Sequence, residues 1–255
     1  MPSTLRSSLL VLAIAALPLV CRAQAPDIPD WALPGSATHK QVPPPAGFHR
    51  ETLTSEIPIG IFDGQSDVGG AVIPGSGLLD DASGKYTVNS AGYNIWYFRD
   101  EFRFLWKKMS GDVSLAATIS FPNPYGYGDR KAVFMVRQDL DDDSKEAMTA
   151  LHGAGLIHLA ERPTKGADIR EIFRVQNKAR IGAPLPRIGI EKHGDQFTLF
   201  VSLAGEPMHQ EGNLMFLHLK EPFYVGVGFT SHQPGTLDSA VLSDVVLENS
   251  AGKVH

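Results

Sequence analysis

The chain from Ile57 onward alternates short apolar runs, rich in Val, Ile, Phe, Tyr and Thr, with clusters of Gly, Asp, Asn and Pro. This alternation is typical of β-strands bounded by turns. No long segment has helical periodicity, although residues 146–151 fit one helical turn as well as they fit a strand. The clearest strands are predicted at residues 86–91, 102–107, 113–121, 132–137, 148–152, 156–162, 170–175, 187–192, 196–202, 223–231 and 239–247.

A hairpin over residues 188–201 is the most distinct local element. His193-Gly194-Asp195 separates two alternating runs, and Gly194 can supply the positive φ that a tight turn needs. Parallel sheets require crossover helices, for which the chain has no candidates. The predicted fold class is therefore all-β, an antiparallel two-sheet jelly-roll sandwich over residues 58–248, with a tail at 249–255.

The first 23 residues have the pattern of a secretory signal peptide. Arg6 precedes an unbroken apolar run at residues 9–20, and small-residue cleavage sites follow around Ala23. The run is shorter than the roughly 20 residues that span a bilayer. Lipidation of Cys21 is disfavoured because the residues just before it are not small. The sequence predicts an exported protein, periplasmic or extracellular, without membrane insertion.

A proline-rich segment follows the predicted signal peptide. Six prolines lie between Gln24 and Phe48, and proline stiffens the chain while removing a backbone donor. Residues 24–57 are therefore interpreted as a linker or as a strap over the domain surface. Trp31 could anchor such a strap, and a loose tail is the competing interpretation.

Composition and charge narrow the function classes. Hydrophobic residues make up 43% and charged residues 20% of the chain, as in ordinary globular proteins. A formal net charge of −5 argues against a nucleic-acid partner, because such proteins need clustered Lys and Arg. The single cysteine lies in the predicted signal peptide, so the domain must be stabilised by its core rather than by disulfides.

Several blocks of the sequence resemble one known group of domains. They are residues 60–69 (GIFDGQSDVG), 86–88, 91–96 (AGYNIW), 100–112 (DEFRFLWKKMSGD), 130–137, 151–156, 162–166, 188–194 and 222–232 (PFYVGVGFTSH). Together they resemble the concanavalin A-like domains of exported bacterial proteins of the Tol biopolymer-transport-like group. The resemblance implies a jelly roll with a curved sheet, and it implies no particular reaction because this fold carries lectins, glycosidases and lyases.

Motifs for known catalytic machinery are missing from the sequence. No Glu-x-Asp-x-x-Glu spacing of a retaining glucanase occurs, and no Gly-x-Ser-x-Gly, phosphate-loop or His-Glu-x-x-His motif. We therefore expect a non-catalytic carbohydrate-binding or interaction module. The alternative hypothesis is a glycan-active enzyme, a lyase or hydrolase, that uses the concave sheet.

Aromatic residues supply one candidate for a sugar site. Trp96, Tyr97, Trp106, Tyr125 and Tyr127 lie near polar residues, and sugar rings stack on exposed aromatic faces. Trp106 alternates with other aromatic residues of its run, which favours a place in the core. The two later tyrosines belong to a loop and are better candidates.

Polar residues inside apolar strands supply a second candidate. Arg137 and Arg162 each interrupt an apolar alternation, and Glu171 in the next strand could pair with either. A buried arginine must be paired, so these residues form either a structural ion pair or a polar groove. In the groove hypothesis, the ligand-binding residues are Trp96, Tyr125, Tyr127, Arg137, His152, Arg162, Glu171 and His232.

Carboxylates suggest a possible structural calcium ion, and no other cofactor is indicated. Asp63, Asp67 and Asp244 could hold calcium where the chain ends meet, although capping of turns is the simpler explanation. The acidic stretch 139–146 resembles a calcium loop but has Ser144 where an EF-hand needs Gly, which favours a solvated hairpin.

Overall fold

The computed structural model describes residues 50–178 and 182–254, which contain strands and no helix. Strand β1 is the first of them, and it extends from Leu53 to Ser55. The end of the segment interpreted as a linker or strap is thus an edge strand. The predicted signal peptide and residues 24–49 of that segment lie outside the described residues.

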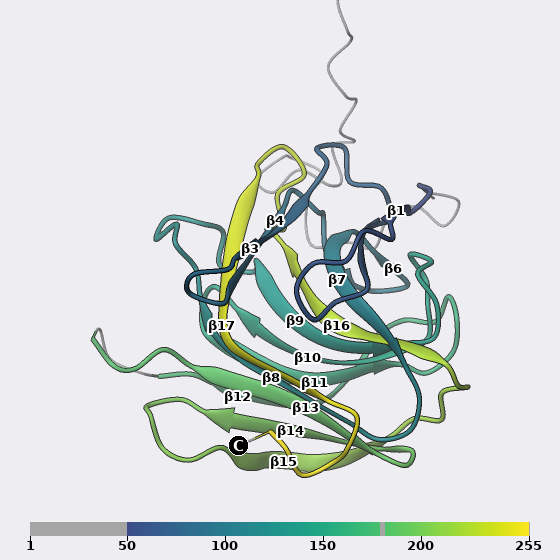
Figure 1. Cartoon of the computed structure of the whole chain (residues 1–255), viewed down its shortest axis with the longest axis vertical. Coiled ribbons are helices and arrows are strands. Elements are labelled where there is room, and N and C mark those ends of the chain that lie inside the picture. The colour runs from purple at the N-terminus through teal and green to yellow at the C-terminus, as the bar shows by residue number, and fades with distance from the viewer. Residues whose placement is uncertain (1–49, 179–181, 255) are drawn as a thin grey trace, which may run out of the picture.

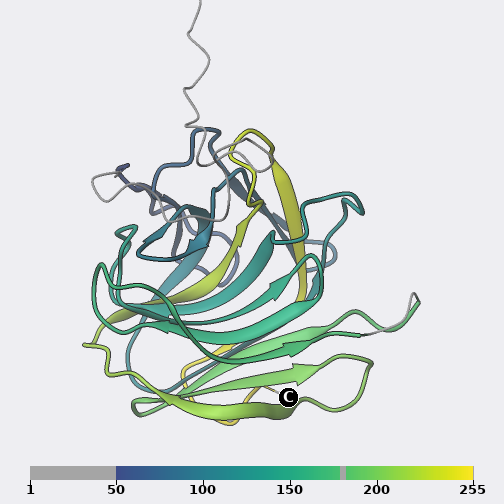
Figure 2. The same cartoon turned by 180° about the vertical axis from the view of Figure 1, so that it is seen from behind.

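Two large antiparallel sheets stack on each other (Figures 1 and 2). The eight-stranded sheet has the order β1, β2 (Gly64–Val68), β7 (Phe102–Met109), β16 (Phe223–Thr230), β9 (Lys131–Arg137), β10 (Glu146–His152), β11 (Leu156–Arg162) and β12 (Arg170–Gln176). The seven-stranded sheet has the order β15 (His209–Phe216), β14 (Gln196–Ser202), β13 (Arg187–His193), β8 (Val113–Ser120), β17 (Asp238–Glu248), β4 (Lys85–Ser90) and β3 (Ser76–Asp80). A small hairpin joins β5 (Ile95–Trp96) to β6 (Arg99–Asp100).

The predicted fold class is confirmed: the chain is an all-β, jelly-roll sandwich. Residues 146–151, for which one helical turn was the alternative, belong to strand β10. Strands β13 and β14 form the expected hairpin, with φ of 56° at Gly194. Among the strands of the two large sheets, the pattern did not reveal β1, β2, β3 or β15. Strand β1 is very short, β2 is mostly polar, and β3 and β15 are edge strands without clean alternation.

The main core lies between the two sheets and follows from the two-residue period of a strand. In β9, for example, Phe134 and Val136 point into this core and are fully buried. The residues that alternate with them along the strand point to the opposite side of the eight-stranded sheet. We call this side the outer face. Each Å² of apolar surface removed from water contributes about 25 cal/mol of favourable free energy, so this inter-sheet core is the main stabilising element.

A second apolar cluster covers part of the outer face. It contains Val133, Met135, Met148 and Ala160 from the strands, together with Ile95 from the β5–β6 hairpin. Strands β9, β10 and β11 are therefore buried on both faces, which explains their long buried runs. In the described part of the chain, no helix has the length and apolar character needed to cross a membrane.

Candidate functional site

Strand register brings the polar residues of the outer face into two separate groups. Glu146 in β10 lies opposite Arg137 in β9 and opposite Arg162 in β11. At the other end of the same strands, Lys131 lies opposite His152. Lys131 and Arg137 are six residues apart on one strand, which separates the two groups by roughly 20 Å.

A pocket occupies the end of the outer face that holds Lys131, and we call it the outer pocket. Its volume is about 190 Å³. Strands β9 to β12 form its floor, and the β5–β6 hairpin with two loops forms its walls. The lining residues are Asn94, Trp96, Tyr97, Asp129, Lys131, His152, Leu156, His158, Glu171 and His232.

Lys131 supplies a buried positive charge to the outer pocket. Its Nζ donates hydrogen bonds to Asn94 Oδ1 at 2.9 Å and to the Ile95 carbonyl oxygen at 3.3 Å. The ammonium also lies 5.4 Å from the ring centre of Trp96, within the range of a cation–π contact. Burial disfavours the charged form and lowers the pKa of Lys131 to about 8.

Two buried histidines lie beside this lysine. The rings of His152 and His158 are 5.1 Å apart, and neither ring nitrogen of either residue has a hydrogen-bond partner among the described residues. Burial, followed by the charge of Lys131, lowers the pKa of His158 to about 3 and lowers the pKa of His152 as well. Both imidazoles are therefore neutral at pH 7, and each offers one donor and one acceptor.

Aromatic rings border the same pocket. Trp96 is half-buried and its ring lies 5.3 Å from that of His158. Tyr127 stacks on His232 with ring centres 5.2 Å apart and an interplanar angle of 8°. Burial raises the pKa of Tyr127, so its phenol keeps its proton at neutral pH. The outer pocket thus combines flat apolar surfaces with hydrogen-bonding groups.

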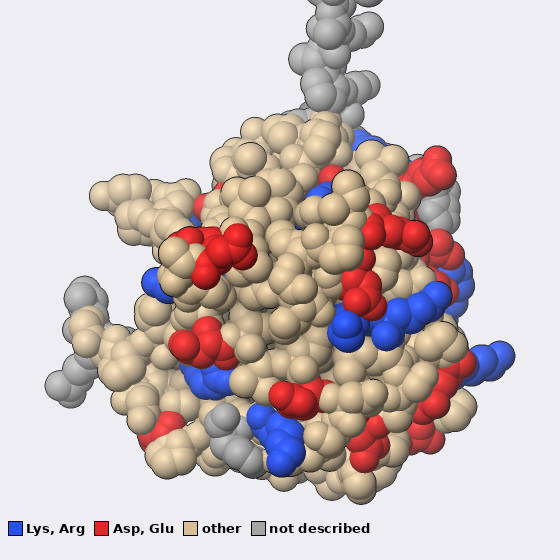
Figure 3. All heavy atoms as spheres, in the orientation of Figure 1, with Lys and Arg blue, Asp and Glu red and all other residues tan. Residues whose placement is uncertain are grey.

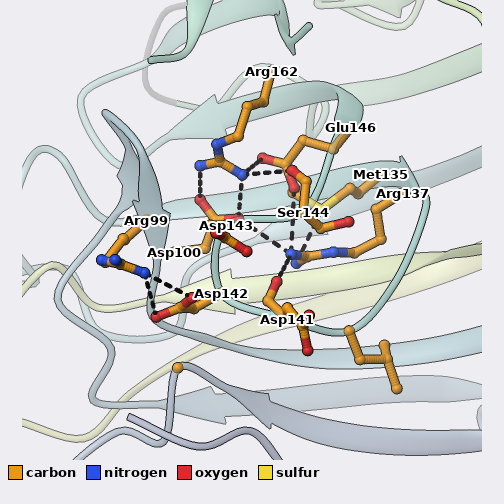
Figure 4. Close-up of polar contacts among 12 residues, drawn as sticks. Arg99, Asp100, Met135, Arg137, Asp141, Asp142, Asp143, Ser144, Glu146 and Arg162 are labelled. Carbon is orange, nitrogen blue, oxygen red and sulfur yellow. Dashed lines mark hydrogen bonds and ion pairs between the residues drawn. The ribbon is translucent and has the colours of Figure 1, made fainter. Parts of the chain in front are cut away.

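The second polar group is a closed network that we call the ionic cluster, formed by Asp100, Arg137, Glu146 and Arg162. All four side chains are fully buried. Arg162 donates a hydrogen bond to Asp100 at 2.6 Å, and its guanidinium lies 3.2 Å from a carboxylate oxygen of Glu146. Arg137 lies 3.3 Å from Asp100 and 3.6 Å from Glu146 (Figure 4).

Backbone carbonyl groups complete the ionic cluster. Arg137 donates to the carbonyl oxygens of Asp139 at 2.9 Å and Asp141 at 2.5 Å. Arg162 donates to the carbonyl oxygens of Ser144 at 2.8 Å and Ala167 at 3.1 Å. Burial, followed by the charge of Asp100, raises the pKa of Glu146. Two guanidinium groups with most of their donors satisfied lie against both carboxyl groups, which is the arrangement that makes buried ionic groups tolerable.

The predicted ligand-binding residues fall into three environments. Trp96, His152, Glu171 and His232 line the outer pocket, and Tyr127 stacks against one of its walls. Arg137 and Arg162 do not line it, because they belong to the ionic cluster, which was the structural alternative for them. Tyr125 is 94% exposed and does not line it either.

Two details of the sequence interpretation need correction. Glu171 pairs with neither buried arginine; it lies 3.5 Å from Arg174 on its own strand. The sequence interpretation missed Lys131 because it is the first residue of its strand, and a polar residue in that position usually marks only the end of the strand. The two-residue period places it on the same face as Arg137, so the alternation itself carried the signal.

The carboxylates proposed for calcium have protein partners. Asp63 accepts a hydrogen bond from Lys107 Nζ at 3.0 Å, and Asp67 lies 3.0 Å from Arg103 Nη1. Asp244 is in the left-handed region with φ of 52°, where β17 has an irregular register. Over residues 50–178 and 182–254, no three Asp, Glu, His or Cys side chains are grouped in a way that could hold a metal ion.

The acidic stretch near Asp139 is neutralised by a lysine. Asp139 and Asp143 each lie 3.3 Å from Lys165 Nζ, and Asp141 contacts the same ammonium group. The stretch is only partly solvated: Asp141 is exposed, whereas Asp142 is buried and lies 3.1 Å from Arg99, and Ser144 and Glu146 are fully buried. The stretch also covers the ionic cluster through its backbone.

Comparisons with known proteins identify the fold. No protein-family model matches the chain, and no curated protein matches it. Among solved structures, a functionally unknown protein from Saccharomyces cerevisiae is similar at 15% identity and a TM-score of 0.51, over 70% of this chain and 97% of that one. Xylan β-1,4-xylosidase from Bacillus halodurans C-125 is similar at 12% identity and a TM-score of 0.50, over 72% of this chain and 36% of the xylosidase.

The carbohydrate-binding module CBM66 from Bacillus subtilis is also similar, at 13% identity and a TM-score of 0.42, over 69% of this chain and 92% of that one. Identities this low establish shared architecture and nothing about activity. The chain therefore has the two-sheet jelly-roll architecture that the sequence resemblance implied.

Proposed function

We propose that this chain is an exported module that binds a carbohydrate in the outer pocket without cleaving it. The observation that carries the proposal is the meeting of Trp96 with two buried, neutral histidines that have no hydrogen-bond partners among the described residues. Sugars need such a combination, because their C–H faces pack on aromatic rings while their hydroxyls exchange hydrogen bonds with polar groups.

The size and charge of the pocket agree with this proposal. A volume of about 190 Å³ is below the roughly 300–1,000 Å³ of pockets for drug-sized ligands, so one sugar ring is the natural occupant. On the face in Figure 3, basic side chains lie in small groups beside acidic ones rather than in one continuous patch. On this face, binding by general attraction to a polyanion is therefore disfavoured relative to binding in a defined pocket.

Export is part of the proposal and rests on residues 1–23, which lie outside the described residues. Their charged start, apolar run and small cleavage residues are the supporting pattern. N-terminal sequencing of the protein recovered from a secreting host should find a chain that begins after Ala23. Recovery of an uncleaved chain from the cytoplasm would contradict export, as well as the Tol-like context that the sequence resemblance implies.

Substitution of Trp96 tests the binding proposal. On a glycan array followed by calorimetry, Trp96→Ala should weaken binding of the selected glycan about tenfold or more, because a central aromatic contact is lost. Phe216→Ala is the matched control, since Phe216 is an aromatic residue of the other sheet and is 69% exposed. Equal glycan binding by both variants and the wild type, or no glycan binding at all, would refute the proposal.

A glycan-active enzyme is the second candidate function, favoured by one specific observation. The phenol of Tyr127, the ammonium of Lys131 and two neutral imidazoles gather in or beside the outer pocket, and such groups can exchange protons with a substrate. Incubation of the protein with the glycan that it binds distinguishes the two functions. New reducing ends or unsaturated products that disappear in His152→Ala would establish the enzyme.

A further inference from the structure

We propose that the outer pocket is specific for an acidic sugar, with the ammonium of Lys131 as the anchor for the carboxylate of a uronic acid. This inference rests on the proposed function, because it names the class of carbohydrate that the pocket takes. It makes Lys131 the residue that determines specificity.

Within the described part of the chain the ammonium of Lys131 forms no close ion pair, although the charges of Asp129 and Asp100 act on it from a longer distance. Only 3% of this residue is exposed, its Nζ donates to an amide and a carbonyl oxygen, and no described carboxylate lies within 4 Å of it. The buried arginines are paired, since Arg130 lies 2.7 Å from Asp238 and Arg103 lies 3.0 Å from Asp67, whereas the buried Lys192 donates to the Gly111 carbonyl oxygen at 3.0 Å. A buried charge without a counterion is costly, so it is normally paired or kept for a ligand.

The position of Lys131 favours a ligand over a purely structural role. Its side chain lines a cavity and lies over the face of Trp96. Two of its three N–H groups are used by protein acceptors, and the third is available. The unpartnered His158, which is 1% exposed, lines the same cavity and can donate a further hydrogen bond. A carboxylate between these donors would accept from both.

The acidic residues of the pocket form no close ion pair with Lys131, although the charge of Asp129 favours its charged form. Asp129 lies 3.9 Å from His152 Nδ1, and Glu171 lies 3.5 Å from Arg174. Both line the pocket and are more exposed than Lys131. They can accept hydrogen bonds from sugar hydroxyls there, while the carboxylate of the sugar enters deeper. A sugar ring rather than a peptide is favoured because Trp96 offers a flat wall in a cavity of one-ring size.

Matched pairs of glycans test the inference on the full-length protein. The probes are oligomannuronate, oligogalacturonate and a glucuronate oligosaccharide, each paired with its carboxyl-reduced form, which differs only in the acid group. By calorimetry at pH 7, at least one acid should bind about tenfold or more tightly than its reduced form, since a charge-assisted hydrogen bond is lost on reduction. Lys131→Met should remove this preference and bring the two affinities within about twofold of each other.

Lys192→Met is the control variant. Lys192 is also a buried lysine, 4% exposed, with Nζ 3.0 Å from the Gly111 carbonyl oxygen and 4.9 Å from the ring centre of Phe223, but it does not line the outer pocket. It should keep the wild-type preference. The comparison of acid and reduced glycans on the wild type requires no variant, so a poorly folded Lys131→Met protein would not block the test.

A pH profile supplies an independent readout. The preference for the acid should decline above about pH 8, where Lys131 loses its proton. The two neighbouring imidazoles, His152 and His158, are already neutral in that range, and the charges of Asp129 and Asp100 also act on Lys131. A constant preference from pH 7 to 10 would overturn the inference.

The outcomes separate the two proposals. Reduced glycans that bind as tightly as the acids, or more tightly, would overturn the acidic-sugar inference and leave carbohydrate binding intact. Binding of none of the acids, alongside tight binding of neutral glycans on the array, would have the same meaning. Failure of every acidic and neutral glycan to bind would refute the proposed function itself.

Discussion

The ionic cluster and the outer pocket lie on the same face of the same three strands, β9 to β11, and treat their charges in opposite ways. In the ionic cluster each guanidinium lies within 3.6 Å of two carboxylates. In the outer pocket the ammonium of Lys131 bonds only neutral oxygens within the described residues. At one end of the face the cations form ion pairs with buried carboxylates, whereas at the other end the cation forms no close ion pair within the described residues.

The covering loops produce this difference. Residues 139–144 and 167 present carbonyl oxygens to Arg137 and Arg162 and close that end of the face. Near Lys131 the covering segments carry side chains such as Trp96 and Asp129, which leave a cavity between them. A polar residue in an apolar strand is therefore not by itself a sign of a binding site, because its role depends on what covers it.

The two regions are also joined through the β5–β6 hairpin. Asp100 ends this hairpin inside the ionic cluster, and Trp96 at its start lines the outer pocket. Arg162 also donates to the carbonyl oxygen of Tyr97, at 3.4 Å, in the turn between the two strands. We infer that the ionic cluster fixes the hairpin and so holds the aromatic wall of the pocket in place.

The largest predicted effect comes from breaking the ionic cluster. Asp100→Ala should lower the free energy of unfolding by about 3–5 kcal/mol, because it leaves buried guanidinium groups short of a counterion. The change is measured by urea unfolding. Because Asp100 also anchors the hairpin, any folded fraction of this variant should bind glycan more weakly than the wild type.

Asp141→Ala serves as the comparison for that substitution. Asp141 also pairs with a cation, Lys165, but its side chain is 66% exposed. Exposed ion pairs contribute about 0–1 kcal/mol, so this variant should unfold close to the wild type. Equal losses in the two variants would mean that burial does not distinguish the ionic cluster from the surface.

The next predicted effect is a loss of folding stability at acidic pH that arises in the outer pocket. The pKa of His158 falls to about 3 in the folded protein because of burial and the nearby Lys131, whereas an unfolded histidine has a pKa of about 6.5. The unfolded state therefore takes up the proton first, so the stabilising contribution is complete above pH 6.5 and is lost as the pH falls toward 3.

His158 alone should cost about 2 kcal/mol of stability between pH 7.5 and pH 5, and His152 adds in the same direction. His158→Leu removes its share, so the difference in unfolding free energy between this variant and the wild type should change by that amount across the range. Urea unfolding at a series of pH values measures it. Parallel curves would show that His158 takes up a proton in the folded state as readily as in the unfolded state.

The sandwich fold could be predicted from the sequence because the alternation of apolar and polar residues in a strand is a local property. Phe134 and Val136 identify their strand as facing a core whatever packs against it. The partner of Arg162 was not predictable in this way, since Asp100 reaches it from a hairpin 62 positions earlier in the chain. The residues of the pocket walls, such as Asn94 and Asp129, belong to loops and are likewise brought in only by the tertiary fold.

The smallest predicted effect concerns the rim of the outer pocket, where the sequence favoured Tyr125 and Tyr127 equally. Tyr127→Ala removes a ring that stacks on His232 and should weaken glycan binding several-fold. Tyr125 is 94% exposed, and the hydrogen bond that it donates to Asn123 comes from its backbone, so alanine keeps it. Tyr125→Ala should change the unfolding free energy by no more than about 0.5 kcal/mol and the glycan affinity by less than about twofold, as calorimetry and urea unfolding can measure. If Tyr125→Ala instead weakens binding as much as Trp96→Ala does, the glycan extends beyond one ring, and its binding surface continues from the pocket onto the loop.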